Sequence, residues 1–268
     1  MIAIIAGTGQ LPLDAAKALL EQNKNFIVIC LFPNDNKEIL EQTLLEKNIK
    51  IISQEFYKAG TILSLLQENF VTEVLFIGKV DKSNLFKNLK LDWLCVKTLA
   101  KAATKSDQTL MEAIINTVQD YGITVLKQSD ILKNLFVKPG VLCGKLTQEI
   151  EEDINFGLNV ADKLSLIDIG QTVVVKNKMI IAVEAIEGTD NCIKKAIEFG
   201  HDNLIICKTA HKDQNQKYDL PTLGPKTLEN IKAGQVKAIA WHSDKTFISN
   251  FDQFVKLAKN LNITLISI

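Results

Sequence analysis

The fold of the first half of the chain is decided by Ile2-Ala3-Ile4-Ile5-Ala6-Gly7-Thr8-Gly9-Gln10-Leu11-Pro12. The five apolar residues predict a buried strand, and the glycines predict a turn that is free of Cβ atoms before a helix with Pro12 in its first turn. A phosphate or a sugar could approach the backbone of such a turn. A strand-to-helix turn that merely needs glycine would have the same sequence, so both interpretations stay open.

Short strands and helices alternate outward from this stretch, which is the order typical of a parallel sheet with crossover helices. We therefore predict a Rossmann-like α/β domain over residues 1–130. Its expected strands are Ile2–Ala6, Phe26–Leu31, Ile51–Ser53, Glu73–Ile77 and Ile123–Leu126. Its expected helices are Leu11–Gln22, Thr61–Glu68, Leu91–Ala103 and Asp107–Asp120.

The periodicity breaks down around Lys138-Pro139-Gly140, so we place a linker over residues 131–147. A second α/β domain is predicted over 148–268, with a mixed sheet and flanking helices, because a hairpin there precedes further alternation. Its expected helices are Gln148–Leu164, Asp190–Phe199 and Pro225–Ala233, and its strands are Thr172–Lys176, Met179–Val183, Asn203–Cys207 and Val236–Trp241.

The amino-acid composition of the chain limits the classes of protein to which it can belong. The chain has 268 residues, 47% of them hydrophobic, with 31 basic and 31 acidic residues, so we expect a globular protein that does not bind nucleic acid. All the basic residues are lysine, so a phosphate site must use lysines and backbone N–H groups. The five cysteines form no Cys-x-x-Cys pair, which favours a reducing cytosol. The longest apolar run, Phe26–Phe32, is too short to span a membrane.

An acidic turn, Glu184-Ala185-Ile186-Glu187-Gly188-Thr189-Asp190, joins the hairpin to the next helix. Thr189 is a natural N-cap, and Asp190 is well placed against the positive end of the helix dipole. Glu184 and Glu187 go beyond what capping needs. Such a cluster suits a divalent cation or sugar hydroxyls, although a solvated acidic loop would have the same sequence.

A second polar turn, Tyr218-Asp219-Leu220-Pro221-Thr222-Leu223-Gly224-Pro225, precedes a helix that should start at Pro225. Asp219 lies just before this helix, and the nearby lysines are Lys208, Lys212 and Lys217. A solvated loop remains the alternative. The three histidines have no metal-binding spacing, so we interpret them as ordinary surface or loop residues: His201, His211 and His242. No motif supports covalent serine or cysteine catalysis.

Two blocks, Ala182-Val183-Glu184-Ala185-Ile186-Glu187-Gly188-Thr189-Asp190 and Asp219-Leu220-Pro221-Thr222-Leu223-Gly224-Pro225, carry a resemblance to a known family. The chain resembles the UDP-2,3-diacylglucosamine pyrophosphatase family of the LpxI type, which acts in lipid A biosynthesis. The likeness runs from the first glycine turn through Gly78-Lys79-Val80 to the closing strand. It implies two α/β domains and magnesium-dependent attack of water on the uridine-linked phosphate, which would give UMP and 2,3-diacylglucosamine 1-phosphate (lipid X).

By matching position, the resemblance assigns the essential family carboxylate to Asp219. It implies Mg²⁺ ligands among Asp219, Glu187 and Asp190. The substrate-binding residues that we expect are Gly7, Thr8, Gly9, Gln10, Gly78, Lys79, Asp107, Gly188, Thr189, Asp190, Lys208, Thr222 and Gly224. The chain departs from the family at Asp81-Lys82 and Lys217-Tyr218, where members often have arginine or Arg-Phe.

Two other functions stay open. A nicotinamide-dependent oxidoreductase is suggested by the glycine turn, but Pro12 occupies the third glycine position and Asp35 lies beyond the expected strand tip. A non-catalytic nucleotide-sugar binding protein would bind the same ligand without turnover.

The expected partners are the lipid-linked substrate, the cytoplasmic face of the inner membrane and a second copy of the chain. The membrane contact is predicted where apolar residues and lysines interleave, at Lys82, Leu85, Phe86, Lys87, Leu89, Lys90, Leu91, Trp93 and Leu94. An amphipathic core helix would have the same pattern.

Overall fold

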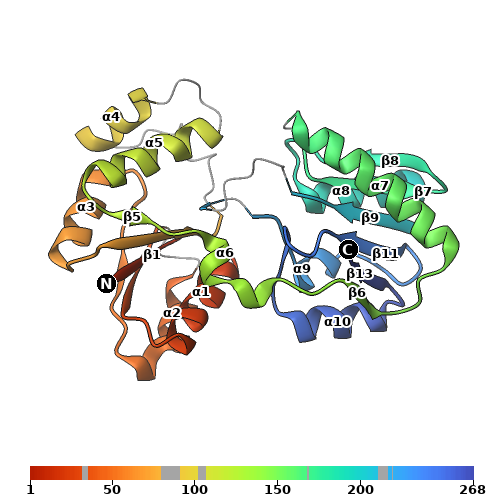
Figure 1. Ribbon diagram of the computed structural model, residues 1–268, viewed down its shortest axis with the longest axis horizontal. Helices are drawn as coiled ribbons and strands as arrows, with labels where there is room; N and C mark the ends of the chain where they lie inside the picture. The colour runs from red at the N-terminus through yellow and green to blue at the C-terminus, as the bar shows by residue number, and fades with distance from the viewer. Residues whose placement is uncertain (32–35, 80–90, 102–106, 168, 211–216, 219) are drawn as a thin grey trace. The chain divides into compact units, whose positions relative to one another are not determined.

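The computed structural model describes residues 1–31, 36–79, 91–101, 107–167, 169–210, 217–218 and 220–268, without the side chains of residues 46, 101, 107 and 108. The chain divides into two compact units (Figure 1). The first unit comprises Met1–Leu132 with Gln216–Tyr218, and the second comprises Lys133–Asn215 with Asp219–Ile268.

The first unit contains a five-stranded parallel sheet in the order β3-β2-β1-β4-β5. Its strands are β1 (Ile2–Ala6), β2 (Phe26–Cys30), β3 (Ile51–Ser53), β4 (Glu73–Ile77) and β5 (Thr124–Val125). All residues of β1 and β2 are buried, which explains why both strands are apolar throughout their length. The predicted parallel sheet is confirmed, and its order puts the carboxyl ends of β1 and β4 side by side.

Helices surround this sheet (Figure 1): α1 (Leu11–Glu21), α2 (Lys37–Leu44), α3 (Ala59–Glu68), α4 (Trp93–Lys101), α5 (Asp107–Asp120) and α6 (Gln128–Ile131), with a short 3₁₀ turn at Leu45–Lys47. A second 3₁₀ turn, Lys133–Leu135, begins the second unit. One face of the sheet packs Ile5, Ile29 and Val74 against Leu66 of α3 and Ile115 of α5. Tyr218 packs against the same cluster.

The second unit contains a six-stranded mixed sheet in the order β6-β13-β11-β9-β7-β8. The central strands β9, β11 and β13 are parallel, β7 runs antiparallel to β8 and β9, and β6 runs antiparallel to β13. The strands are β6 (Gly140–Cys143), β7 (Thr172–Lys176), β8 (Met179–Val183), β9 (Leu204–Lys208), β11 (Val236–Trp241) and β13 (Thr264–Ser267). A separate parallel pair is formed by β10 (Thr222–Leu223) and β12 (Phe247–Ile248).

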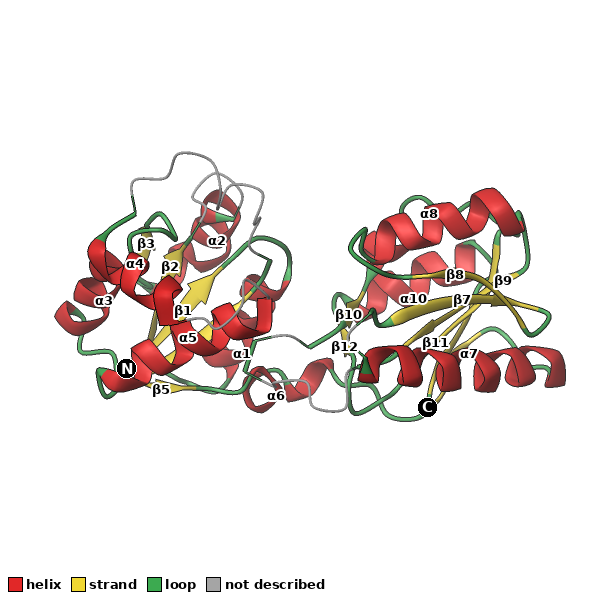
Figure 2. Ribbon diagram, turned by 90° about the horizontal axis from the view of Figure 1, so that it is seen from above, coloured by secondary structure: helices red, strands yellow, loops and turns green. Residues whose placement is uncertain are grey.

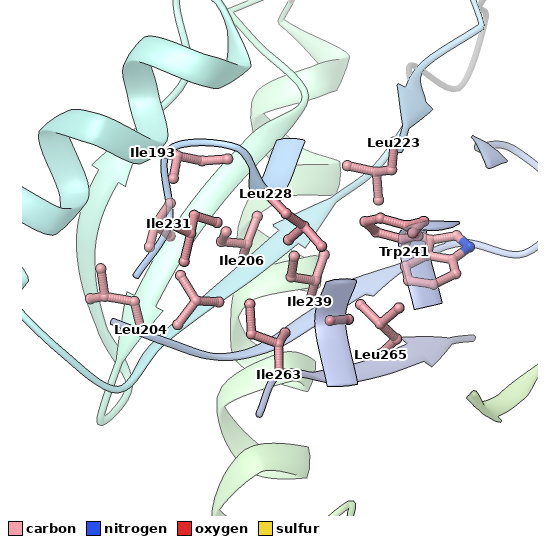
Figure 3. Close-up of a cluster of buried hydrophobic side chains, with 14 of the residues drawn as sticks. Ile193, Leu204, Ile206, Leu223, Leu228, Ile231, Ile239, Trp241, Ile263 and Leu265 are labelled. Carbon is pink, nitrogen blue, oxygen red and sulfur yellow. The ribbon is translucent and has the colours of Figure 1, made fainter. Parts of the chain in front are cut away.

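Helices cover both faces of this sheet (Figure 2). On one face, α7 (Gln148–Leu166) packs Ile154 and Leu158 against Ile205 and Cys207 of β9. The other face packs against α8 (Thr189–Gly200), α9 (Pro225–Leu228) and α10 (Phe251–Asn260) through a larger apolar cluster that includes Trp241 (Figure 3). Successive residues of β9 therefore contact opposite helix layers.

Two expectations from the sequence differ from the structure, and a third falls largely on residues that the structure does not describe. The segment predicted as a linker contains β6, three of whose four residues pair with β13 at the sheet edge, and such tertiary pairing has no local sequence signal. The helix predicted over Pro225–Ala233 ends at Leu228, and the chain continues in turns. Of the predicted membrane-contact residues, those from Lys82 to Lys90 lie outside the described residues. In the part that the structure describes, no helix is long and apolar enough to cross a bilayer.

Candidate functional site

The glycine turn of the first unit lies where β1 and β4 end side by side. Thr8 and Lys79 form an antiparallel bridge, with N–H to O distances of 2.7 Å from Thr8 to Lys79 and 2.9 Å in return. A Cβ on Gly7 would lie 2.5 Å from the carbonyl oxygen of Lys79, and one on Gly78 would lie 2.8 Å from that of Thr8. Glycine is therefore required at both positions because the two strand ends touch backbone to backbone.

Asn36 forms hydrogen bonds with the backbone of this turn, a contact that sequence reasoning missed. Its side-chain amide donates to the carbonyl oxygens of Gly7 and Gly9, both at 2.9 Å, and the residue is only 5% exposed. Within the described residues, the backbone N–H groups of Gly9 and Gln10 have no hydrogen-bond acceptor. A turn with its carbonyl groups bound and its N–H groups available at a helix start suits an anion.

A buried charged network lies at the edge of the second sheet where β9 ends. Lys208 is 4% exposed, and its Nζ donates to Thr189 Oγ1 at 2.8 Å and to Thr172 Oγ1 at 3.1 Å. Thr189 donates in turn to Glu184 Oε1 at 2.9 Å. The other carboxylate oxygen, Glu184 Oε2, lies 3.8 Å from Lys208 Nζ. We call these four residues the Lys208 network.

The sheet topology brings the members of this network together. β7 runs antiparallel to both β8 and β9, so the start of β7 lies beside the ends of the other two strands. Thr172 is paired with Lys208, and Glu184 directly follows β8. In open α/β sheets, ligands bind outside the carboxyl ends of the parallel strands, and the Lys208 network occupies this position.

Glu184 is the most unusual member of the network. Burial has the largest single effect on its carboxyl, and alone it would raise the pKa. The charge of Lys208 opposes this effect, as do hydrogen bonds from Thr172, Thr189 and the backbone at Gln171. Together these groups hold the pKa below its ordinary value. The carboxylate is therefore ionised at neutral pH. Glu184 Oε2 is buried and accepts no hydrogen bond from the described chain, so it is available to an N–H or O–H donor.

Thr189 does not cap α8 as its position in the sequence suggested. The N-cap is Gly188, which has φ +79°, and no side chain caps the helix. A positive φ suits glycine, so the cap moves back one residue and Thr189 becomes the first helical residue. Its hydroxyl is thereby free to join Lys208 and Glu184.

The predicted cation ligands Glu187 and Asp190 lie beside this network but do not belong to it. Glu187 Oε2 accepts from the backbone N–H of Ala185 at 3.1 Å, and Asp190 is exposed in the first turn of α8. Among the described residues, no three histidine, cysteine, aspartate or glutamate side chains lie together as a metal site would require. Mg²⁺ binding by this chain stays a prediction.

The described part of the Asp219 block, Leu220 to Pro225, lies on the strand pair β10–β12. Thr222 pairs with Phe247, and Gly224 is the N-cap of α9, which begins at Pro225 as predicted. Asp219 lies outside the described residues, as does the side chain of Asp107. The roles assigned to them stay predictions.

A second polar cluster, which sequence reasoning missed, lies on the opposite face of the same strand ends. Asp162 of α7 accepts hydrogen bonds from the hydroxyl of Thr209 and from Nε2 of His242, the latter at 3.1 Å. His242 was interpreted as an ordinary surface or loop residue, and its side chain is 22% exposed. The sequence separation of 80 residues between His242 and Asp162 left no local signal.

Comparison with known proteins identifies the family. Residues 1–135 match the LpxI N-terminal domain, and residues 138–266 match the LpxI C-terminal domain. The chain belongs to the LpxI family. This confirms the resemblance carried by the Glu-Gly-Thr-Asp and Asp-Leu-Pro-Thr blocks, and it places the Lys208 network within the LpxI C-terminal domain.

One LpxI relative covers the entire chain. The UDP-2,3-diacylglucosamine pyrophosphatase LpxI of Caulobacter vibrioides is 24% identical over 280 residues, which span 100% of this chain and 97% of that protein. Among solved structures, a UDP-glucose-4-epimerase from Stenotrophomonas maltophila, with bound NAD and formylated UDP-arabinopyranose, overlays with a TM-score of 0.32 at 14% identity. That overlay covers 46% of this chain and 34% of the epimerase.

Proposed function

We propose that this LpxI chain hydrolyses UDP-2,3-diacylglucosamine to UMP and 2,3-diacylglucosamine 1-phosphate in lipid A biosynthesis. Family membership over the whole chain and the activity for which the Caulobacter relative is named support this reaction. The structural observation that carries the proposal is the Lys208 network, because Glu184 and Thr189 come from one family block and converge on a buried lysine.

The chemistry of this network suits a nucleotide sugar. Lys208 supplies a positive charge in a low-dielectric position, where its attraction for a phosphate is stronger than at the surface. Glu184 Oε2 offers an acceptor for a sugar hydroxyl or an amide N–H of the headgroup. A ligand that carries both phosphates and hydrogen-bond donors would therefore engage both charges of the pair.

The glycine turn supports binding of a second anionic group in the first unit. Asn36 holds the carbonyl groups of Gly7 and Gly9, and the N–H groups of Gly9 and Gln10 have no acceptor among the described residues. We assign phosphate contacts to Gly7, Thr8, Gly9 and Gln10 on this basis. Gly78 and Lys79 support the turn through the backbone bridge.

We further propose that Mg²⁺ assists the reaction. Mg²⁺ is usually bound by one or two carboxylates together with substrate phosphates and water, so it needs no cluster of three protein ligands. The half-buried carboxylate of Glu187 and the exposed carboxylate of Asp190, together with Asp219, offer suitable oxygen ligands. When bound, the cation would neutralise negative charge on the diphosphate.

A membrane surface is the place where this substrate would be met, because each buried methylene of an acyl chain contributes about 0.8 kcal/mol. We therefore propose peripheral binding to the cytoplasmic face of the inner membrane. Trp93, at the start of α4, is 79% exposed and is a candidate contact. Liposome flotation of the wild type and Trp93→Ser, with Tyr121→Ser as a matched exposed aromatic control, tests this assignment.

The reaction is tested by incubating the protein with UDP-2,3-diacylglucosamine in oxygen-18 water, with Mg²⁺ or with EDTA. We expect UMP to form only with Mg²⁺ and to carry the label, since water attacks the uridine-linked phosphorus. Label in the sugar phosphate would refute this direction of attack. Binding of the substrate without release of UMP would instead indicate a nucleotide-sugar binding protein.

A further inference from the structure

Asp162, Thr209 and His242 form a hydrogen-bonded cluster, which we call the Asp162 cluster. Thr209 is fully buried, and its hydroxyl donates to Asp162 Oδ1. His242 Nε2 lies 3.1 Å from Oδ1 and 3.3 Å from Oδ2 of the same carboxylate. The three side chains come from α7, the end of β9 and the end of β11, so three elements fix the orientation of one imidazole.

This arrangement determines which nitrogen of His242 is available. An ionised carboxylate only accepts hydrogen bonds, so Nε2 carries the proton and Nδ1 presents a lone pair. Nδ1 has no hydrogen-bond partner among the described residues. An imidazole that is oriented by a carboxylate and has one available nitrogen can accept a proton.

His242 lies at the same strand ends as the Lys208 network. Trp241 is paired with Lys208, so the next residues on the two strands, His242 and Thr209, are neighbours. Lys208 contacts Thr189 of α8, whereas Thr209 contacts Asp162 of α7, so the two clusters occupy opposite faces of the strand ends.

The loop that begins at His242 leads into β12, which pairs with the described part of the Asp219 block. Phe247 N–H donates to Pro221 O at 2.9 Å, and Ser249 N–H donates to Leu223 O at 2.9 Å. The loop between β11 and β12 therefore connects His242 to the strand that pairs with the described part of that block.

We propose that His242, positioned by Asp162, accepts the proton of the attacking water in the hydrolysis. In this step the water oxygen bonds to the uridine-linked phosphorus while its proton passes to His242 Nδ1. The bond from that phosphorus to the bridging oxygen breaks, and its electron pair leaves with the sugar phosphate. The inference rests on the proposed function. It assigns this proton transfer to a residue outside both family blocks.

Several charged groups would influence His242. Asp162 of α7 bonds directly to the ring. The end of β9 contributes Lys208 on the opposite face, and the loop of His242 contains Asp244 and Lys245. In β13, the neighbouring strand, Ser267 has no ionisable side chain. Ile268, which follows β13, accepts a hydrogen bond from the backbone N–H of Ser243 at 2.7 Å. Asp162 is therefore the group whose removal should change proton transfer most directly.

The experiment compares His242→Ala, Asp162→Asn and a control, His201→Ala, in which the exposed histidine that follows α8 is removed. We expect His242→Ala to lower kcat by about a hundred to ten thousand-fold, the usual range for a lost acid–base group, with KM within a few-fold of wild type. Added imidazole should restore part of the rate in this variant. Asp162→Asn should lower kcat and shift the acidic limb of the pH profile, whereas His201→Ala should change neither.

The outcomes separate the two proposals. Wild-type release of UMP with an unchanged kcat in His242→Ala, or a loss that imidazole does not restore in a variant of unchanged Tm, would refute the role of His242 alone. Failure of the wild type to release UMP would refute the proposed function and the proton transfer with it. The ¹⁵N shifts of the imidazole provide a readout without activity: Nε2 should be protonated in the wild type, and Nδ1 protonation there would overturn the orientation.

Discussion

Replacing Lys208 by methionine removes one partner of a buried ion pair and keeps the length of the side chain. The Lys208 side chain is 5% exposed and that of Glu184 is 14% exposed. In Lys208→Met, the Glu184 carboxylate keeps the hydroxyl of Thr189 but loses its counter-charge. The carboxylate would then remain buried without compensation, which is the reason to expect a large effect.

The burial of Lys208 and Glu184 sets the size of the expected loss in the free energy of unfolding. Removing one partner of a buried pair typically destabilises a protein by about 3–5 kcal/mol, so we expect a loss of about 3 kcal/mol in the free energy of unfolding of the second unit at neutral pH. A matched exposed pair is Lys237 with Glu149, at 3.3 Å, where the side chains are 39% and 85% exposed. Lys237→Met should lose at most about 1 kcal/mol.

The stability lost in Lys208→Met should become smaller as the pH falls. The pKa of Glu184 is lowered in the folded wild type, so its contribution to stability is present above the unfolded value of 4.5 and is lost as pH falls through the lower folded pKa. In Lys208→Met, burial without the lysine should raise this pKa above the unfolded value. The variant should therefore gain stability relative to the wild type as the pH falls.

Urea denaturation followed by tryptophan fluorescence provides the assay, because Trp241 is fully buried in the core of the second unit. The variants are measured at neutral pH and at about pH 4, with the Lys208→Met, Glu184→Leu double variant included. Most of the lost stability should return in the double variant, since no buried charge is left unpaired. A loss in Lys208→Met no larger than in Lys237→Met, or one that is independent of pH, would refute the reasoning.

Three further predictions concern other parts of the chain. Asp219→Asn should lower the rate of UMP release by about a hundred to ten thousand-fold without loss of folding, measured by kinetics and circular dichroism, and near-wild-type activity would remove Asp219 from the mechanism. Gly7→Ala should destabilise the first unit by about 1–3 kcal/mol, because the added Cβ meets the carbonyl of Lys79; an unchanged Tm would contradict this. The native thiols should not react with Ellman's reagent at pH 8, since all five cysteines are buried and burial raises the pKa of Cys30 to about 11 and that of Cys192 to about 12. Rapid labelling of the folded chain would count against that burial.

Much of the fold could be predicted because the pattern of buried residues is local. Strand β1 is apolar at every position, and the hairpin β7–β8 turns at Asn177 and Lys178, both of which have positive φ. Strand β6 escaped prediction because Gly140–Cys143 become a strand only by pairing with β13, more than a hundred residues later. Its sequence, next to Lys138-Pro139-Gly140, indicates a break in regular structure.

The candidate site was predictable only in part, for a similar reason. Glu184, Thr189 and Lys208 were singled out from their sequence blocks, but the hydrogen bonds that join them depend on how β7, β8 and β9 are ordered in the sheet. Thr189 was expected to cap α8, and the positive φ of Gly188 shifts that role by one residue. Asn36 and His242 form hydrogen bonds with residues so distant in the sequence that no local pattern encodes the contact.

The end of β9 has a consequence for how the chain tolerates insertions and deletions. Lys208 and Thr209 are consecutive residues, and they serve clusters on opposite faces of the sheet. Because side chains alternate between faces along a strand, a one-residue deletion within β9 would exchange the two faces, sending an ammonium toward Asp162 and a hydroxyl toward Glu184. Both clusters would be lost together. Length variation among relatives should therefore be absent from β9 and confined to the loops beyond it.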